Sequence, residues 1–243
     1  MKQQLDGQTL VVLGGSGGIG FATARLARDE GAAVIITGRD PDRLHAAAEK
    51  LDAKSSAVFD ATNPEALDSF FGKLGGPVDH ILVAAGGAYY APLADFNFRE
   101  AHHSVDEHLW LPLRVARHSQ DAIRPGGSLL LMSGTGARRP AVGVALGAAL
   151  AAGLPALTAD LALELAPTRV NLLAPGFVDT PLSAAILGDQ LDARRDQLAK
   201  TLPIRRVIGP EDVAALAVHL MTNTAITAAT YDIDGGQQVA LTS

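Results

Sequence analysis

The sequence predicts an α/β fold in which helices cover both faces of a doubly wound parallel sheet. Hydrophobic runs of strand length alternate with amphipathic stretches of helical length along the whole chain. The strand-like runs are continuously apolar rather than alternating, which is typical of parallel strands buried on both faces. Proline and glycine lie between the predicted elements and do not gather in a linker, so we expect a single domain over residues 1–243.

The predicted elements follow one another in the order that this fold requires. The first apolar run, residues 9–15, leads into a helix at residues 21–31. The other predicted strands are residues 32–38, 57–62, 80–87, 127–134, 168–176 and 229–236. The other predicted helices are residues 40–51, 63–74, 98–122, one that contains residues 144–153, and 210–221. Asp40 or Asp42 can cap the second helix, because a short carboxylate accepts a hydrogen bond from a free N–H group of the first turn.

Composition and charge exclude several functions. The net charge is −6 and basic residues cluster only as short pairs such as Arg138-Arg139, so nucleic acid is not an expected partner. The chain has no cysteine, which excludes disulfide bonds and thiolate metal sites. Histidine and carboxylate residues show no metal-binding spacing, so we expect no metal. The first apolar run meets a glycine loop and no signal-peptide cleavage site, which predicts a cytoplasmic protein.

One segment has the length of a membrane span. Residues 140–159 include twenty successive uncharged residues, and about 20 apolar residues can cross a bilayer. They are mostly alanine and glycine with Pro155 among them, and alanine favours membrane insertion much less than leucine or isoleucine does. We therefore expect a soluble protein with no membrane partner, in which this segment is a buried helix that packs closely on its neighbours.

A glycine-rich loop follows the first predicted strand. The segment LGGSGGIG satisfies the pattern G-x-G-x-x-G through Gly15, Gly17 and Gly20, and G-x-x-x-G-x-G through Gly14, Gly18 and Gly20. Glycine permits the tight turn and lets the backbone approach a pyrophosphate, while the N-terminus of the next helix supplies N–H donors. Between a strand and a helix, the loop predicts a dinucleotide site and a Rossmann-type fold.

The end of the second predicted strand favours NADP(H) over NAD(H). A carboxylate at this place binds the ribose 2′-hydroxyl group of NAD. Here the place holds Gly38, and Arg39 follows it. An arginine can pair with a 2′-phosphate through two hydrogen bonds, and the missing carboxylate removes a repulsion. The alternative is that Arg39 is a solvated residue before the next helix.

These features resemble the short-chain dehydrogenase/reductase family over nearly the whole chain. The resemblance extends to Asn171 in the sixth predicted strand and to the C-terminal stretches GPEDVA and DGG. Ala85-Gly86 match the end of the family's Asn-Asn-Ala-Gly motif, although Val83-Ala84 stand where the asparagines would be. The loop, Arg39 and the resemblance together imply these cofactor-binding residues: Gly14, Ser16, Gly17, Gly18, Ile19, Gly20, Arg39, Asp60, Ala61, Ala85, Gly86, Pro175, Gly176, Val178 and Thr180.

The resemblance fails at the catalytic positions. The family uses a tyrosine as acid/base, a lysine four residues later, a serine about thirteen residues earlier and a helix asparagine. Aligned from both sides, these positions hold Gly147, Ala151, Gly134 and Asp106 in this chain. A phenol with a pKa of about 10 needs a nearby cation to work near neutral pH. Neither group is present, so the family's usual mechanism is not expected here.

Several residues are candidates for a replacement acid. The resemblance puts Asp106 in the cleft, with His102 one turn before it on the same helix face. Tyr89 and Tyr90 follow the fourth predicted strand, beside the expected pocket. Strand alternation favours the hydroxyl group of Thr135 over that of Ser133. The alternative is that all of these are capping, solvated or pocket-lining residues.

The remaining histidines and the lid have simpler interpretations. His102, His103 and His108 fit ordinary positions on a helix surface. Residues 181–203 correspond to the segment that closes over the substrate in the family, and they read as an amphipathic lid. Leucine and isoleucine of this segment face inward, which predicts a mainly apolar pocket.

Three functions remain open from the sequence. The first is an atypical NADP(H)-dependent oxidoreductase acting on a small carbonyl or alcohol by a non-standard proton donor. The second is a catalytically silent NADP(H)-binding sensor or assembly protein. The third is a non-redox enzyme, such as a dehydratase or isomerase, that reuses the cleft. In the family the fourth and fifth helices form an oligomer contact, so we also expect a homo-oligomer, a dimer or a tetramer.

Overall fold

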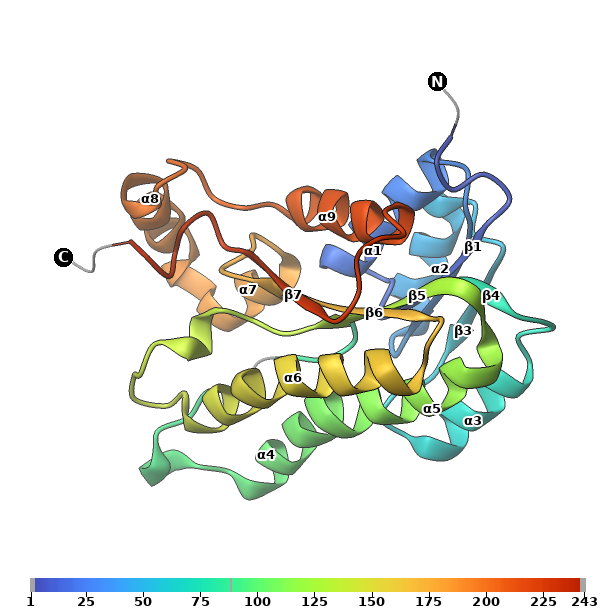
Figure 1. Cartoon of the computed structure of the whole chain (residues 1–243). Helices are drawn as coiled ribbons and strands as arrows, with labels where there is room; N and C mark the ends of the chain where they lie inside the picture. The colour runs from blue at the N-terminus through green and yellow to red at the C-terminus, as the bar shows by residue number, and fades with distance from the viewer. Residues whose placement is uncertain (1–2, 88, 241–243) are drawn as a thin grey trace.

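The computed structural model describes residues 3–87 and 89–240 (Figure 1). The predicted domain of residues 1–243 therefore includes a few residues outside this description, namely 1–2, 88 and 241–243. The strands are β1 Thr9–Leu13, β2 Ala33–Gly38, β3 Ser55–Val58, β4 Val78–Val83, β5 Ile123–Met132, β6 Arg169–Pro175 and β7 Ala229–Ile233. They form one sheet in the order β3-β2-β1-β4-β5-β6-β7, and every neighbouring pair is parallel.

Helices connect these strands across both faces of the sheet. They are α1 Gly18–Asp29, α2 Pro41–Leu51, α3 Pro64–Gly72, α4 Phe98–Val105, α5 Leu111–Ala122, α6 Ala145–Glu164, α7 Pro181–Leu187, α8 Leu191–Thr201 and α9 Pro210–Thr222. Short helical turns are η1 Leu93–Asp95, η2 Asp106–Trp110, η3 Gly136–Arg138 and η4 Gly188–Gln190. Because β2 and β4 lie on opposite sides of β1, the strand order reverses beside β1, where such folds bind ligands.

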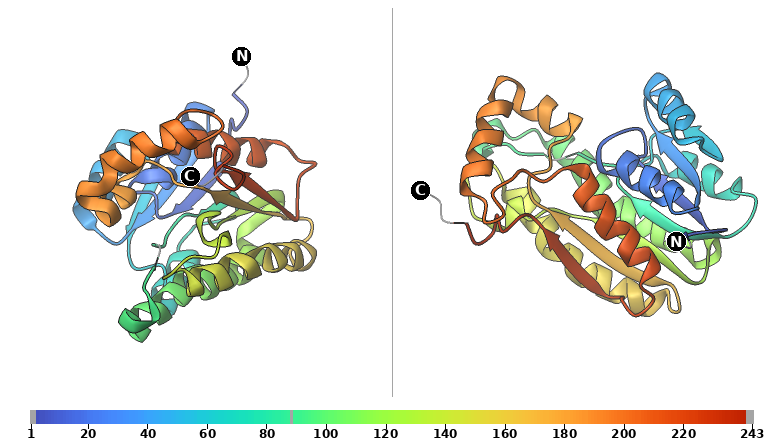
Figure 2. Two further views of the ribbon diagram at one scale, coloured as in Figure 1. Left: turned by 90° about the vertical axis from the view of Figure 1, so that its left-hand side faces the viewer. Right: turned by 90° about the horizontal axis from the view of Figure 1, so that it is seen from above.

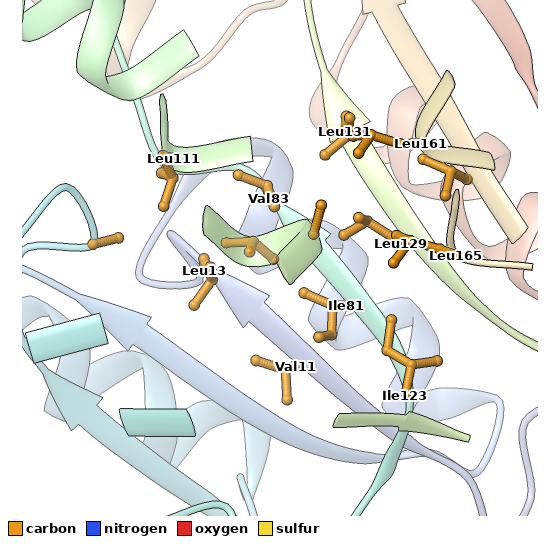
Figure 3. Packing of buried hydrophobic residues seen from close by; sticks show 14 of the residues in the cluster. Val11, Leu13, Ile81, Val83, Leu111, Ile123, Leu129, Leu131, Leu161 and Leu165 are labelled. Atoms are coloured by element: carbon orange, nitrogen blue, oxygen red, sulfur yellow. The ribbon is translucent and has the colours of Figure 1, made fainter. Parts of the chain in front are cut away.

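The sheet separates two apolar layers, and β1 contributes to both. Val11 and Leu13 pack with residues of α3, α5 and α6, in the cluster that Figure 3 shows from close by. Leu10 and Val12 point to the opposite face and pack with residues of α1, α2 and α9. Successive side chains of a strand point to opposite faces, so a run with no polar residue serves two cores. The doubly wound α/β fold is confirmed.

The boundaries of β3 differ from the prediction at both ends. The apolar run predicts a strand at residues 57–62, whereas β3 covers Ser55–Val58. It begins earlier because Ser55 and Ser56 lie on the exposed edge of the sheet, where no apolar signal is needed. It ends earlier because the Asp60 carboxylate accepts hydrogen bonds from the N–H and hydroxyl groups of Thr62, which turn the chain.

The predicted helix at residues 98–122 is continuous but contains a π-helical turn. This turn, η2, separates α4 from α5, and all flanking residues keep helical dihedral angles. Pro112 follows it at the start of α5. Proline has no N–H group for the bond to residue i−4, and a local change of helical repeat accommodates this loss.

Helix α6 is less buried than the sequence predicts. It packs against β6 and β7 through one face, with Leu154 and Leu161 in the apolar cluster. However, only 22% of its most apolar stretch is buried inside the chain, although its length and composition alone would allow a membrane span. The expectation of a buried helix therefore holds for one face only. Leu163, on the other side, is 79% exposed.

A buried polar pair lies inside the sheet between β4 and β5. Nδ1 of His80 is 2.8 Å from the hydroxyl oxygen of Ser128, and Nε2 is 2.6 Å from Oε1 of Gln8. Both His80 and Ser128 are almost fully buried. Burial, with a smaller effect of the Arg169 charge, lowers the pKa of His80 to about 4. The imidazole is therefore neutral in the folded protein near neutral pH.

Helices α7 and α8 lie at the end of the sheet where the parallel strands end. Figure 2 shows them beyond the carboxyl ends of the strands, on the side where α6 begins. They cover residues 181–201, which matches the extent of the predicted lid. This end of the molecule also holds the glycine-rich loop, which follows the end of β1.

Candidate functional site

The glycine-rich loop between β1 and α1 has no room for side chains at two positions. A Cβ atom on Gly14 would lie 2.7 Å from the backbone nitrogen of Ala85, and φ of Gly14 is +91°. A Cβ atom on Gly20 would overlap the carbonyl oxygen of Gly14. The N–H groups of Gly14 and Gly15 donate to the carbonyl oxygen of Thr37, which fixes the turn against β2. The loop therefore presents backbone at the start of α1, as a pyrophosphate site requires.

The loop after β6 reaches the glycine-rich loop from the other side. A Cβ atom on Gly18 would lie 3.6 Å from Cγ2 of Thr180. Thr180 also caps α7, because its hydroxyl oxygen accepts a hydrogen bond from the N–H group of Ser183. Ile19 and Val178 line the same cavity as Thr180. The residues predicted for the pyrophosphate and for the nicotinamide end of a dinucleotide are thus brought together.

The C-terminal DGG stretch holds Pro175 and Gly176 in place. A Cβ atom on Gly176 would lie 2.6 Å from Oε1 of Gln237 and 2.7 Å from Cβ of Asp234, so only glycine fits there. Oε1 of Gln237 accepts a hydrogen bond from the N–H group of Phe177. The carboxylate of Asp234 accepts from the N–H groups of Gly236 and Gln238. Gln237 lines the cavity and was not predicted from the sequence.

The end of β2 has Gly38 at the position of an NAD-binding carboxylate and two arginines nearby. A Cβ atom on Gly38 would lie 3.2 Å from the hydroxyl oxygen of Ser16, so Ser16 fills the space beside this strand end. Arg39 is mostly exposed next to it. Arg43, which the sequence analysis did not single out, places a guanidinium nitrogen 3.1 Å from the position of a Cβ atom on Gly17. Two guanidinium groups and a hydroxyl group therefore lie close to the end of β2.

Asp60 lies after β3 on the same rim of the sheet. Its Oδ1 accepts hydrogen bonds from the N–H group of Thr62 at 2.9 Å and from its hydroxyl group at 2.8 Å. Burial favours the neutral acid, but these bonds and the charges of Arg39 and His103 hold the pKa of Asp60 below its usual value. Asp60 is thus an ionised hydrogen-bond acceptor, as an adenine amino group needs. Ala61, the next predicted contact, is buried.

Glu107 is a buried carboxylate that the sequence analysis missed. It is 8% exposed, and its Oε2 accepts a hydrogen bond of 2.9 Å from the N–H group of Gly87. Oε1 lies 3.2 Å from Nε2 of His103 and 3.7 Å from a guanidinium nitrogen of Arg39. Its Cβ is 3.4 Å from the position of a Cβ atom on Gly86, whose φ is +131°. Glu107 therefore holds the loop after β4 against the helix and links it to the adenosine end of the site.

A cavity of about 750 Å³ opens beside the predicted cofactor-binding residues, which together we call the cradle. Ala85, Gly86, Pro175 and Gly176 form its wall on the cofactor side. The lid faces it with Leu182, Ile186, Leu187, Gln190, Arg194 and Gln197. Most of the remaining lining is apolar, and the volume fits a small organic molecule next to the reactive end of a dinucleotide.

Three of the four positions aligned with the family's catalytic residues line this cavity, and none of the three has a polar side chain. Gly134, Gly147 and Ala151 all face it. Ring carbon Cε1 of Tyr90 lies 3.6 Å from the position of a Cβ atom on Gly147, so Tyr90 covers this part of α6 from the opposite loop. Helix α6 therefore forms an apolar wall where acid/base chemistry would be expected.

The structure brings only some of the predicted candidates to the cavity. Tyr89 and Tyr90 line it, and the hydroxyl oxygen of Tyr89 accepts a hydrogen bond of 2.7 Å from the N–H group of Asn97. Asp106 does not belong to the lining, and His102 is exposed to solvent. Thr135 is fully buried behind the wall, while the neighbouring Ser133 reaches the cavity.

His108 belongs to the lining although the sequence places it on the helix surface. Its ring nitrogen Nδ1 is 2.9 Å from the carbonyl oxygen of Ser104, which also lines the cavity. Buried Ala101 lies three residues before Ser104, and buried Leu111 and Val115 lie three and seven residues after His108. Such spacing puts them all on one helix face. This apolar spacing was the sequence signal that would have found His108.

No group of three or more histidine and carboxylate side chains able to hold a metal occurs within residues 3–87 and 89–240. Several features of the described site suit an organic dinucleotide. The glycine-rich loop, the cationic strand end, ionised Asp60 and the side-chain-free turn at Gly176 all fit such a group.

Comparisons with known proteins agree with this geometry. A family model described as enoyl-(acyl carrier protein) reductase matches residues 14–238. The short-chain dehydrogenase/reductase malC of Malbranchea aurantiaca is 30% identical over 97% of this chain and 96% of its own length. This chain belongs to the short-chain dehydrogenase/reductase family. Dehydrogenase/reductase SDR family member 4 of Homo sapiens is also 30% identical, over 97% of this chain and 89% of its own.

Solved structures of short-chain dehydrogenases/reductases share the whole fold. MalC reductase/Diels-Alderase from Malbranchea aurantiaca has a TM-score of 0.90 and 28% identity, covering 98% of this chain and 99% of that one. BdcA in complex with NADPH has a TM-score of 0.86 and 27% identity, covering 96% of this chain and 95% of that one. The chain is thus similar from end to end to an oxidoreductase family whose solved structures include NADPH complexes.

Proposed function

We propose that this short-chain dehydrogenase/reductase is an NADP(H)-dependent oxidoreductase for a small carbonyl or alcohol substrate, with a proton donor outside α6. One observation carries the proposal. In the cofactor cradle, neighbouring atoms leave no room for a side chain at Gly14, Gly20 and Gly176. The adjoining wall has only Gly147 and Ala151 where the family's tyrosine and lysine would stand. A cradle beside an open cavity supports cofactor chemistry on a bound molecule.

The preference for NADP(H) rests on the end of β2. Arg39 and Arg43 bring two positive charges to a strand end that holds Gly38 in place of an NAD-binding carboxylate, with the Ser16 hydroxyl group between the loop and the strand. A guanidinium group binds a phosphate through charge-assisted hydrogen bonds that a ribose hydroxyl group cannot match. Solved relatives in complex with NADPH are consistent with this preference.

The residues of this chain position the reactants rather than supply the reducing electrons. When bound, the nicotinamide ring supplies a hydride. Pro175, Gly176 and Thr180 would hold the nicotinamide end, and the lid over residues 181–203 would exclude water from the cavity. Holding two reactants in contact contributes a large part of such a rate enhancement, while acid/base help adds about 10²–10⁴-fold. An enzyme that lacks the usual acid can therefore keep its redox activity.

The substrate should have a mainly apolar body. Leu150, Leu154, Leu182, Ile186 and Leu187 contribute apolar lining from α6 and the lid. Arg194 is a lid cation that lines the cavity near the Phe177 ring, at 6.0 Å from the ring centre. Aromatic ketones and aldehydes are therefore suitable first members of a substrate panel.

Two measurements test the proposal together. Fluorescence titration should show tighter binding of NADPH than of NADH. Consumption of NADPH should then be followed against a panel of aryl and alkyl ketones and aldehydes. Binding of NADPH with no turnover of any carbonyl would favour the sensor function, and equal affinity for NADPH and NADH would remove the cofactor preference.

A non-redox enzyme is the second candidate, and one relative favours it specifically. The solved MalC structure is described as a reductase/Diels-Alderase, so a similar fold combines reduction with a reaction that transfers no hydride. The apolar α6 wall of this chain would suit a reaction that depends on substrate shape. Product formation that is equally fast with NADP⁺ and NADPH would distinguish this function from reduction.

We also propose a homo-oligomer that uses α5 and α6. Much of α6 is apolar and yet exposed in the single chain, and Leu163 is 79% exposed. Trp110, between α4 and α5, is 48% exposed. Large apolar surfaces of this kind mark protein contacts in soluble domains. Light scattering at micromolar concentration should give the mass of a dimer or a tetramer, and a mass of 25.1 kDa would contradict the proposal.

A further inference from the structure

We infer that His108 is the group that exchanges a proton with the substrate. This inference rests on the proposed function, since it names the proton donor for that same cavity. His108 lies in the π-helical turn η2, away from the α6 wall on which the family's acid stands. It lines the cavity together with Gly134, Gly147 and Ala151.

The first argument is the fixed orientation of the imidazole ring. Nδ1 of His108 lies 2.9 Å from the carbonyl oxygen of Ser104. A carbonyl oxygen only accepts hydrogen bonds, so Nδ1 carries a hydrogen and donates it. In the neutral ring this leaves Nε2 without a hydrogen, and Nε2 has no hydrogen-bond partner within the described residues. Nε2 is therefore the atom that can gain and release a proton.

The second argument is the place of the ring. Cε1 of His108 lies 3.7 Å from the position of a Cβ atom on Gly86, a residue of the cofactor-side wall. Cε1 is bonded to both ring nitrogens, so Nε2 lies next to this contact. The imidazole is thus held at the cofactor end of the cavity, where the reacting carbon and oxygen of a substrate must lie.

The third argument is that three other titratable groups of the described lining, Glu107, Tyr90 and Arg194, are less suited. Both carboxylate oxygens of Glu107 are already engaged, one with the Gly87 N–H group and one with His103 and Arg39. Burial raises the pKa of the Tyr90 phenol, which makes it a weaker acid. Arg194 stays protonated and donates no proton at ordinary pH.

The step is a simple proton transfer beside a hydride transfer. In reduction, the carbonyl π bond breaks, the carbon gains the hydride supplied by the reduced cofactor, and the oxygen takes the proton from Nε2 of protonated His108. The ring becomes neutral with Nδ1–H still bonded to Ser104, and solvent returns the proton to Nε2. In alcohol oxidation the same atom accepts the proton.

Two variants and a control test this role. His108→Gln and His108→Asn both remove the titrating group. Both are made so that the test still works if one of them fails to fold. His219→Gln is the control, because His219 is exposed on α9 and does not belong to the cavity lining. Thermal unfolding and NADPH affinity should match the wild type in all three, whereas kcat for any reduced carbonyl should fall about 10²–10⁴-fold in the His108 variants only.

The pH profile gives a readout that a structural role would not move. The wild-type kcat for reduction should fall as pH rises, because Nε2 must be protonated, and the His108 variants should lose this fall. The charged and titratable groups that share the described cavity lining with His108 are Glu107 on its own helix, Tyr89 and Tyr90 after β4, and Arg194 on α8. His103 and Arg39 pair with Glu107. The described lining residues of α6 include no charged or titratable group. Tyr90→Phe should therefore be measured beside the His108 variants, and its kcat for reduction should still fall as pH rises.

A measurement without turnover checks the geometry. In ¹⁵N-labelled protein at alkaline pH, the His108 resonances should show a hydrogen on Nδ1 and none on Nε2. The opposite tautomer would overturn the inference. Wild-type kcat in both His108 variants, or loss of the pH-dependent fall in Tyr90→Phe instead, would overturn it while leaving the proposed function intact. A wild-type protein that binds NADPH and reduces nothing would refute the proposed function, and the inference with it.

Discussion

Tyr90 packs against Gly147, with its ring carbon Cε1 3.6 Å from the place that a Cβ atom on Gly147 would occupy. The two residues belong to opposite walls of the cavity, one in the loop after β4 and one on α6. A tyrosine on α6 at this position would meet the ring of Tyr90. The lack of a side chain at Gly147 on α6 and the packing of Tyr90 from the opposite loop are thus parts of one arrangement.

Gly147→Ala should raise stability rather than lower it. Gly147 is helical, and an added Cβ atom would meet Cβ of Ala137 at 3.5 Å and Tyr90 at 3.6 Å, which are ordinary contacts. Alanine is favoured over glycine inside a helix by about 0.5–1 kcal/mol. Urea unfolding should show this gain in the free energy of unfolding. A loss of more than about 1 kcal/mol would mean that the wall is packed more tightly than these distances indicate.

Gly20→Ala should abolish cofactor binding. The added Cβ atom would overlap the carbonyl oxygen of Gly14, so the loop or α1 must move. Overpacking of this kind costs about 1–3 kcal/mol. Titration with NADPH and thermal unfolding measure the two effects. Gly72→Ala at the end of α3 is the matched control, because nothing lies within 4 Å of its added Cβ atom. NADPH affinity of Gly20→Ala equal to that of Gly72→Ala would contradict the assignment of the loop.

Arg39→Ala should weaken NADPH binding and leave NADH binding nearly unchanged. A hydrogen bond to a charged group contributes about 1.5–3 kcal/mol, which corresponds to about 10- to 100-fold in affinity. Fluorescence titration of both cofactors gives the ratio. Arg25→Ala is the control, since Arg25 on α1 makes an exposed ion pair with Glu211 away from the site. An equal loss for both cofactors would mean that Arg39 binds adenine or ribose and not the 2′-phosphate.

His80 should make the fold less stable as pH falls from about 6.5 to about 4. Its pKa is about 4 in the folded protein against 6.5 for a free imidazole, so the unfolded chain binds more protons in this range. The stabilising contribution is present above pH 6.5 and is lost on acidification, by about 3 kcal/mol in total. Urea unfolding at several pH values should show a smaller loss for His80→Gln than for the wild type. The exposed His45→Gln control should keep the wild-type pH dependence.

The sequence predicted the fold and the cradle because both depend on local constraints. Continuous apolar runs such as Leu10–Leu13 can only be strands buried on both faces. The glycines of the loop have almost no alternative, since backbone atoms fill the space beside Gly14 and Gly20. Asp40 caps α2 as one of two predicted possibilities, with its carboxylate accepting from the N–H group of Arg43.

The rest of the site depends on contacts between segments that are distant in the sequence. Arg43 and Gln237 reach the cradle through side chains whose direction the sequence pattern does not give. Alignment to the family pointed to Asp106, whereas the helix presents Ser104, Glu107 and His108 to the cavity. The signal that was missed is the helical spacing of His108 from buried apolar residues. This spacing should have been weighed against the family alignment, which pointed to Asp106. The exposure of α6 was missed for a related reason, because an apolar segment looks the same whether its own chain or a partner covers it.

The most direct test of the central claim is the kinetics of NADPH oxidation by the purified protein against a carbonyl panel, measured beside those of His108→Gln. The expected result is turnover by the wild type that falls with rising pH, and a loss of about 10²–10⁴-fold in His108→Gln with unchanged NADPH affinity. NADPH binding without turnover of any carbonyl would contradict the claim that this cradle and cavity form a reductase site.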